Sequence, residues 1–301
     1  MRVILFGAGA SNGSGAVHPE PPPLGGDLFR LLAQAFPQTW RALPPPYRAA
    51  FAGPFEKGMA AILATHLVSP LMQDMALFFT QYLVAPGNAY TSFVAALREA
   101  GRLDDAAFAT LNYECLLEMA LSATGRSVNY WDAFQQSTDE SAVWKLHGSC
   151  NFLPSDHGNA VVRARRGVSF VGTGGMFNVA LRATDLAEAR AFVLGDTALF
   201  PAMAFYAPGK QVQISQATIQ HIQGHYAAAV SAATAVAVIG VRPNPEDDHV
   251  WGPLASTPAR VLFVGGRDEY TDWKRSHRGR RPTRYLGGRF NEAIDGLVAA
   301  L

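Results

Sequence analysis

Cysteine is scarce in this chain of 301 residues, where Cys115 and Cys150 are the only two. Two thiols cannot supply the four ligands of a cysteine zinc ribbon or the disulfide framework of a small secreted protein. An excess of charge is also missing, because 25 basic and 24 acidic residues leave a formal net charge of +1. This balance argues against a strongly basic nucleic-acid binder and against attachment to an anionic membrane.

Long apolar runs are absent as well. The longest weakly polar stretch, residues 226–241, is shorter than the roughly 20 residues that span a bilayer. The apolar run at residues 2–6 is too short for the core of a signal peptide. We therefore expect a cytoplasmic protein without a membrane-spanning segment.

What the sequence does contain is a series of short apolar runs followed by polar or glycine-rich loops. Such runs are typical of parallel strands that are buried on both faces. Because helix-like patterns follow most of them, the sequence predicts an α/β fold with a Rossmann-like, doubly wound parallel sheet. The five predicted strands are residues 2–6, 107–111, 143–146, 235–239 and 260–264.

Two stretches do not fit the sheet, and we predict a single domain, residues 1–301, that carries them as insertions. The first, about 37–101, contains three consecutive prolines and apolar helical segments, which predict a helical insertion. The second, about 151–209, is smaller and carries hairpin-like runs at 161–163 and 168–171. Helical periodicity is clearest after Asp27, which matches an N-cap, and again toward the C-terminus from Phe290.

A glycine-rich loop follows the first predicted strand, with the sequence Gly7-Ala8-Gly9-Ala10-Ser11-Asn12-Gly13. Glycines at this place let the backbone turn sharply and approach a pyrophosphate, although a tight turn without a ligand explains them equally well. The loop departs from the dinucleotide fingerprint G-x-G-x-x-G, because Asn12 occupies the position of its third glycine. A phosphate loop of the G-x-x-x-x-G-K-[ST] type is absent from the sequence.

Polar residues also follow the later strands. Ligands of open α/β sheets bind beyond the carboxyl ends of the strands, so these segments are expected to converge. Asn112 on its own is compatible with a helix N-cap, and His147 on its own with a structural histidine. The segments are Thr110-Leu111-Asn112-Tyr113-Glu114, Lys145-Leu146-His147-Gly148-Ser149 and Val238-Ile239-Gly240-Val241.

In this order the four motifs resemble the sirtuin family, and the segment Leu24-Gly25-Gly26-Asp27-Leu28-Phe29 is most similar to its bacterial anti-phage defence branch. The resemblance implies cleavage of the bond between nicotinamide and ribose in NAD⁺, with His147 as general base and Asn112 on the ribose. It assigns cofactor binding to the glycine loop and to later positions. These binding residues are Gly7, Ala8, Gly9, Ser11, Asp27, Glu114 and Gly240.

The sequence departs from the sirtuin pattern at three places. Glu114 replaces the usual aspartate, and Val241 replaces a polar residue of the later glycine loop. The third is the cysteine count, since sirtuin deacetylases carry a four-cysteine zinc ribbon. We therefore expect no zinc and favour an NAD⁺ hydrolase, which transfers ADP-ribose to water. The alternatives are a regulatory subunit that binds NAD⁺ or ADP-ribose without turnover, and an NAD-dependent protein deacylase or ADP-ribosyltransferase.

An NADase that is always active would harm its own cell, so the resemblance also implies control. We expect a homo-oligomer, or assembly with a defence partner such as a HerA-type hexameric ATPase, and nucleic-acid contact only through that partner. The six basic residues from Lys274 to Arg284 are interpreted as a hydrated loop, with a contact to nucleic acid or to a partner as the alternative. His221 and His225 lie one helical turn apart, but Ile222 replaces the glutamate of H-E-x-x-H, so we predict no metal site.

Overall fold

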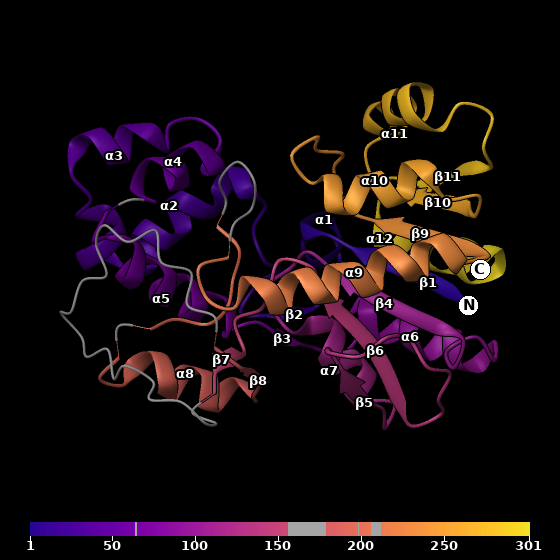
Figure 1. Ribbon diagram of the computed structural model, residues 1–301, viewed down its shortest axis with the longest axis horizontal. Coiled ribbons are helices and arrows are strands. Elements are labelled where there is room, and N and C mark those ends of the chain that lie inside the picture. Colours follow the sequence, from indigo (N-terminus) through magenta and orange to yellow (C-terminus); the bar gives the residue numbers. More distant parts are fainter. Residues whose placement is uncertain (64, 156–178, 198, 206–211) are drawn as a thin grey trace. The chain divides into compact units, whose positions relative to one another are not determined.

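The five apolar runs form the middle of one parallel sheet in the computed structural model, which describes residues 1–63, 65–155, 179–197, 199–205 and 212–301 (Figure 1). The chain divides into two compact units, each of which is described by itself. Unit 1 consists of Met1–Pro22, Tyr82–Leu146 and Gln220–Leu301, and unit 2 of Pro23–Gln81 and His147–Ile219.

Unit 1 contains a seven-stranded sheet in the order β11-β10-β9-β1-β4-β6-β5, and every neighbouring pair is parallel. Helices flank the sheet, so the predicted α/β, Rossmann-like doubly wound fold is confirmed. The strands are β1 (Arg2–Phe6), β4 (Ala106–Thr110), β5 (Ser127–Asn129), β6 (Glu140–Lys145), β9 (Ala235–Ile239), β10 (Arg260–Val264) and β11 (Thr283–Gly287). A separate antiparallel pair joins β2 (Val17–His18) to β3 (Leu83–Val84).

The helices of unit 1 pack on the sheet through aromatic side chains. Phe6 of β1 contacts Tyr90 and Phe93 of α6, and all three contact Phe290 of α12. These rings are almost completely buried, and they tie the first strand to the last helix. The helices are α1 (Ala8–Asn12), α6 (Ala89–Glu99), α7 (Leu116–Ser122), α9 (Gln216–Ala232, which starts in unit 2), α10 (Asp248–Ser256), α11 (Arg267–Trp273), the π-helix η2 (Lys274–Arg278) and α12 (Phe290–Ala300).

Unit 2 is mainly helical in its described part. Its core is a cluster of aromatic rings in which Phe29 stacks on Phe51 with 4.5 Å between ring centroids, and Trp40 packs against Phe51 and Phe55. Gly58 leaves room for this cluster, because a Cβ there would lie 2.1 Å from the Phe51 ring. The elements are α2 (Gly25–Ala35), the π-helix η1 (Pro37–Arg41), α3 (Pro45–Ala50), α4 (Phe55–Ile62), α5 (Val68–Phe79), β7 (Phe152–Pro154), β8 (Leu181–Ala183) and α8 (Leu186–Leu194).

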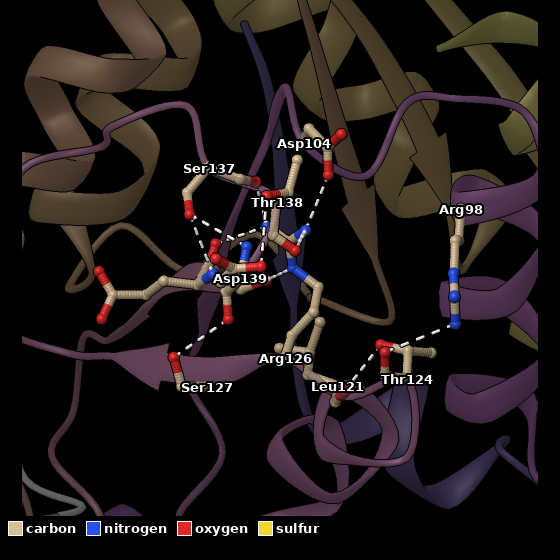
Figure 2. Close-up of polar contacts among 11 residues, drawn as sticks. Arg98, Asp104, Leu121, Thr124, Arg126, Ser127, Ser137, Thr138 and Asp139 are labelled. Atoms are coloured by element: carbon tan, nitrogen blue, oxygen red, sulfur yellow. Dashed lines mark hydrogen bonds and ion pairs between the residues drawn. The ribbon is translucent and has the colours of Figure 1, made fainter.

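A buried arginine fixes the edge of the sheet at β5 and β6 (Figure 2). Arg126 lies just before β5, and its Nε donates a hydrogen bond to Ser141 Oγ at 2.7 Å. One terminal nitrogen reaches Asp104 Oδ1 and the carbonyl of Thr138, each at 2.8 Å, and the other reaches the carbonyl of Ser137 at 2.6 Å. The guanidinium thus holds the loop before β6 with the directional donors that a lysine lacks.

The structure corrects two local predictions. Asp27 is not an N-cap, because Leu24 occupies that position and Asp27 lies in the first turn of α2, where it pairs with Arg30 at 3.2 Å. The basic segment is not a hydrated loop throughout, because part of it forms η2 and Arg278 is buried. The hairpin-like runs 161–163 and 168–171 lie outside the described residues.

Arg278 uses all of its donors inside unit 1. Its Nε donates to Thr283 Oγ1, and its two terminal nitrogens donate to carbonyl groups at 2.6–3.2 Å. These carbonyls lie at the end of α10 and in the loops before β10 and β11, so one side chain ties three chain segments together. They belong to Leu254, Thr257, Ala259 and Pro282.

Among the helices in the described part of the chain, none has both the length and the apolar character needed to cross a membrane.

Candidate functional site

The order of the strands locates a topological switch point in unit 1. From β1 the sheet continues through β4 on one side and through β9 on the other. Ligands of open α/β sheets bind beyond the carboxyl ends of the strands at such a point. In this chain the carboxyl ends of β1 and β9 lead directly into Gly7 and Gly240.

The two glycine segments meet backbone to backbone. Gly7 N donates to the carbonyl of Ile239 at 3.0 Å, and Gly9 N donates to the carbonyl of Gly240 at 2.9 Å. A Cβ on Gly7 or Gly9 would lie 2.7 or 2.9 Å from the Gly240 oxygen. The sequence left two reasons open for the glycine loop, a pyrophosphate or a tight turn, and the structure adds a third, namely that the two glycine segments pack against each other.

Gly240 is the most restricted of the three, and we expect Gly240→Ala to destabilise unit 1 strongly. Its φ angle is +65°, and a Cβ there would lie 2.0 Å from Ala10 N, which is backbone and cannot move aside alone. The free energy of unfolding should fall by roughly 2 kcal/mol or more, as measured by urea denaturation. Gly224→Ala is the control, because it lies in α9 with nothing within 4 Å of the added atom. Equal unfolding curves for the two variants would contradict the packing argument.

The side chain of Ser11 lies at the centre of a buried polar network in unit 1. Its hydroxyl donates to Glu114 Oε1 at 2.5 Å, accepts from Asn112 Nδ2 at 2.8 Å and lies 2.9 Å from the Tyr90 hydroxyl. A serine hydroxyl offers one donor and two acceptor positions, and this set of partners uses all three. A phosphate contact through Ser11 Oγ would therefore replace one of these hydrogen bonds.

Asn112 is not a helix N-cap, because Cys115 occupies that position of α7. Its Nδ2 donates to the carbonyl of Gly7 at 3.1 Å as well as to Ser11 Oγ, so both amide protons are used. This pair of bonds fixes the amide plane beside the carboxyl end of β1. The group that the Asn112 side chain can offer a ligand is its oxygen, Oδ1, which is a hydrogen-bond acceptor.

Glu114 is almost completely buried, and both of its carboxylate oxygens have partners. Oε1 accepts from Ser11 Oγ, and Oε2 accepts from the backbone N of Leu116 at 2.8 Å. Burial raises the pKa of this carboxyl group, and the nearby Lys145 ammonium and the hydrogen bonds offset part of that rise. The Glu114 side chain, which the resemblance assigned to cofactor binding, thus supports the Ser11–Asn112 pair through a buried hydrogen bond.

Sequence reasoning missed Lys145 and Glu118, which complete the network. Lys145, the last residue of β6, is fully buried and donates from Nζ to the carbonyl of Glu114 at 2.6 Å. The same nitrogen pairs with Glu118 Oε1 of α7 at 3.0 Å. Lys145 was overlooked because it ends an otherwise apolar strand. The one sequence signal for the pair was this charged residue at the end of a buried strand, next to the His147-Gly148 motif.

Tyr90, Asn88 and Ser14 were also missed, because Asn88 and Tyr90 lie in the predicted helical insertion and Ser14 lies just beyond the glycine-rich loop. Asn88 caps α6 through Tyr90 N and donates to Ser14 Oγ at 3.0 Å. Ser14 Oγ in turn donates to the carbonyl of Ser11 at 2.8 Å. The start of α6 thereby fixes both the loop after α1 and the Tyr90 hydroxyl beside Ser11.

The raised pKa of Glu114 predicts a pH dependence of stability. The native state holds this proton more tightly than the unfolded chain, so stability falls as pH rises from the ordinary glutamate range through the native pKa. Glu114→Gln should remove that contribution, which urea unfolding at a series of pH values from 4 to 7 would measure. Glu99→Gln, an exposed change in α6, is the control and should reproduce the wild-type profile. A Glu114→Gln profile parallel to wild type would contradict the assignment.

The other predicted residues lie as follows. Ala8, in the first turn of α1, is exposed. Asp27 lies in unit 2, is exposed, and has Arg30 as its ion-pair partner.

His147 belongs to unit 2, two residues after the end of β6, and its side chain is buried. Within that unit its carbonyl accepts from Ala204 N at 2.7 Å, and Ser149 N donates to the carbonyl of Ala202 at 2.9 Å. Gly148 between them has φ +74°, and a Cβ there would lie 2.0 Å from the Ala202 oxygen. Residues 202–204 therefore form hydrogen bonds with the backbone on either side of Gly148. These contacts fix the backbone that carries the His147 imidazole.

The chain matches no protein-family model, and no curated protein matches it significantly.

Proposed function

We propose that this protein is a sirtuin-like NAD⁺ hydrolase that releases nicotinamide and ADP-ribose. The observation that carries the proposal is the fixed Asn112 amide at the carboxyl end of β1, beside the glycine junction of the Rossmann switch point. This is the place where an α/β sheet binds a dinucleotide, and a rigid acceptor at that place suits a ribose hydroxyl.

The reaction breaks the bond between the nicotinamide nitrogen and C1′ of the ribose, and water supplies the oxygen that joins C1′. In this proposal Gly7, Ala8 and Gly9 lie along the pyrophosphate, and Gly240 allows the close approach of the backbone. Asn112 Oδ1 accepts from a hydroxyl of the nicotinamide ribose. Its orientation comes from Ser11 and Glu114, which act through Asn112 and are positioning residues.

His147 is the general base in this proposal and takes the proton of the attacking water. An imidazole suits this role because histidine titrates closer to neutral pH than any other side chain. The backbone contacts of the segment 147–149 keep the ring on a rigid support within its unit.

One observation favours a second candidate, a subunit that binds NAD⁺ or ADP-ribose without turnover. Glu114 stands where the resemblance expects an aspartate on nicotinamide, yet both of its oxygens are used within the protein. A site that lacks a nicotinamide contact could keep affinity for the phosphates and riboses while losing the chemical step. A deacylase is disfavoured, since two cysteines cannot form the zinc ribbon of the deacetylases.

The resemblance further suggests an effector of bacterial anti-phage defence that depletes NAD⁺ in the infected cell. Its control would come from self-association or from a partner such as a HerA-type hexameric ATPase. Light scattering of the purified chain, alone and with that ATPase, would show which assembly forms.

The test of the proposed function is to incubate the purified protein with NAD⁺, alone and with the assembled partner, and to quantify nicotinamide by liquid chromatography. Release of nicotinamide and ADP-ribose in equal amounts supports the hydrolase. Calorimetric NAD⁺ binding without release in any assembly state supports the binding subunit instead. Nicotinamide release that requires an acylated lysine peptide would replace the hydrolase with a deacylase.

A further inference from the structure

The clearest unassigned group of chemistry-bearing side chains is a histidine pair on α9. His221 and His225 lie one turn apart, and their Nε2 atoms are 3.0 Å apart. The rings meet edge to face, with centroids 4.3 Å apart and an interplanar angle of 73°. His221 is exposed and His225 is half-buried, so solvent reaches the pair.

The periodicity of α9 explains why both rings face outward. Ile222 and Tyr226, the residues that follow each histidine, are fully buried. Gln223 fixes the helix further, because its Nε2 donates to the carbonyl of Leu146 at 2.8 Å. Side chains four residues apart share a face of a helix, so a helix held in this way keeps the two imidazoles together. The helix can be followed in Figure 1 as the long orange ribbon labelled α9.

The sequence alone predicted no metal at this pair because it lacks the glutamate of H-E-x-x-H. From the geometry we propose instead that His221 and His225 form a two-nitrogen site for a transition-metal dication, Cu²⁺ or Ni²⁺ in preference to Zn²⁺. Metal–imidazole bonds of about 2.0–2.1 Å place two ligands about 2.9 Å apart at a right angle and about 3.3 Å apart in a tetrahedron. The separation of 3.0 Å corresponds to the right angle, which square-planar and tetragonal Cu²⁺ and Ni²⁺ sites use.

The surroundings of the pair favour the same class of ion. Helix α9 contains no Asp, Glu, Lys or Arg, so neither a carboxylate that would attract Mg²⁺ or Ca²⁺ nor a cation that would repel a metal belongs to this helix. Neutral imidazoles suit Cu²⁺, Ni²⁺ and Zn²⁺ rather than hard, oxygen-seeking ions. When the metal binds, each neutral imidazole offers its Nε2 lone pair and carries its proton on Nδ1, and water fills the remaining coordination positions.

The site is tested by titrating the full chain with Cu²⁺, Ni²⁺, Zn²⁺ and Mg²⁺ by calorimetry and by recording the Cu²⁺ electron paramagnetic resonance spectrum. The matched control is the double variant H225A/A228H, which keeps the histidine count but separates the rings by two turns; Ala228 is exposed. Wild type should bind Cu²⁺ roughly 10²-fold more tightly than this variant, because two linked ligands act together. Its spectrum should show two equivalent nitrogen ligands.

Three outcomes would overturn the proposal. Equal Cu²⁺ affinity for wild type and H225A/A228H would show that the pair does not act as a chelate. Zn²⁺ affinity above that of Cu²⁺ and Ni²⁺ would contradict the right-angle geometry, and Mg²⁺ binding of similar strength would contradict the imidazole site. Circular dichroism of the double variant shows whether α9 is still folded. The test does not involve NAD⁺, so it is independent of the proposed function.

Discussion

Replacing Arg278 with lysine should lower the free energy of unfolding by at least about 3 kcal/mol. The guanidinium donates five hydrogen bonds, four of them to carbonyl groups around the end of α10 and the loops before β10 and β11. A lysine ammonium has three donors at a single point and cannot reach this spread of acceptors. Buried carbonyls would lose their partners, and each such loss costs about 1–3 kcal/mol.

Urea unfolding followed by tryptophan fluorescence would measure this effect, because Trp251 and Trp273 of unit 1 pack together on α10 and α11. Arg275→Lys is the matched control, since Arg275 is exposed and its ion pair with Asp272 at 3.4 Å is also exposed. That change should alter stability by less than about 1 kcal/mol. Similar unfolding midpoints for the two variants would show that the hydrogen bonds of Arg278 do not contribute the stability expected of them.

Replacing His147 with alanine should reduce NAD⁺ hydrolysis by about 10²–10⁴-fold, the usual contribution of a general base. In the proposed mechanism His147 accepts the proton of the attacking water, and alanine has no group that can accept it. The loss should fall on kcat, with a smaller change in KM, because NAD⁺ would still meet the glycine loop and Asn112. The measurement is initial nicotinamide release over a range of NAD⁺ concentrations.

Two further variants make the His147 result interpretable. His277→Ala changes an exposed histidine in η2 and should retain wild-type turnover. His147 is buried, so a second variant, His147→Asn, keeps a polar side chain at this position. It should also lose activity, because asparagine cannot act as a general base. Thermal unfolding of each variant reports whether the protein is folded. Wild-type turnover in a folded His147→Asn protein would remove His147 from the mechanism while showing that the chain still hydrolyses NAD⁺.

The central strands could be predicted from the sequence because burial on both faces leaves an unmistakable apolar run. The predictions for β1, β9 and β10 match the observed bounds, and β4 and β6 were each located to within a few residues. The edge strands β5 and β11 were not predicted. β5 has three residues, and β11 carries Arg284, which is exposed at the edge, so neither has the apolar signature of the interior.

The polar network of unit 1 was only partly predictable. The motifs pointed to Ser11, Asn112 and Glu114, which do lie together, but their order alone could not show that they bind one another. Lys145 meets Glu118 only because the fold brings the end of β6 to the first turn of α7, which the order of the motifs along the chain does not reveal. Arg278 shows the same limit, because a run of basic residues does not reveal which one turns inward to satisfy buried carbonyls.

The position of β1 in the sheet has a consequence for biosynthesis. This strand is made before both of its partners, β4 and β9, since Arg2 pairs beside Ala106 on one side and beside Ala235 on the other. Both edges of this strand, which is apolar from Val3 to Phe6, therefore stay unpaired until neighbours that are made much later are available. Strands in that condition fold slowly and associate with other chains. A nascent chain stalled before residue 235 should consequently bind chaperones and aggregate. In the longer chain, β9 pairs with the edge of β1 that was left free.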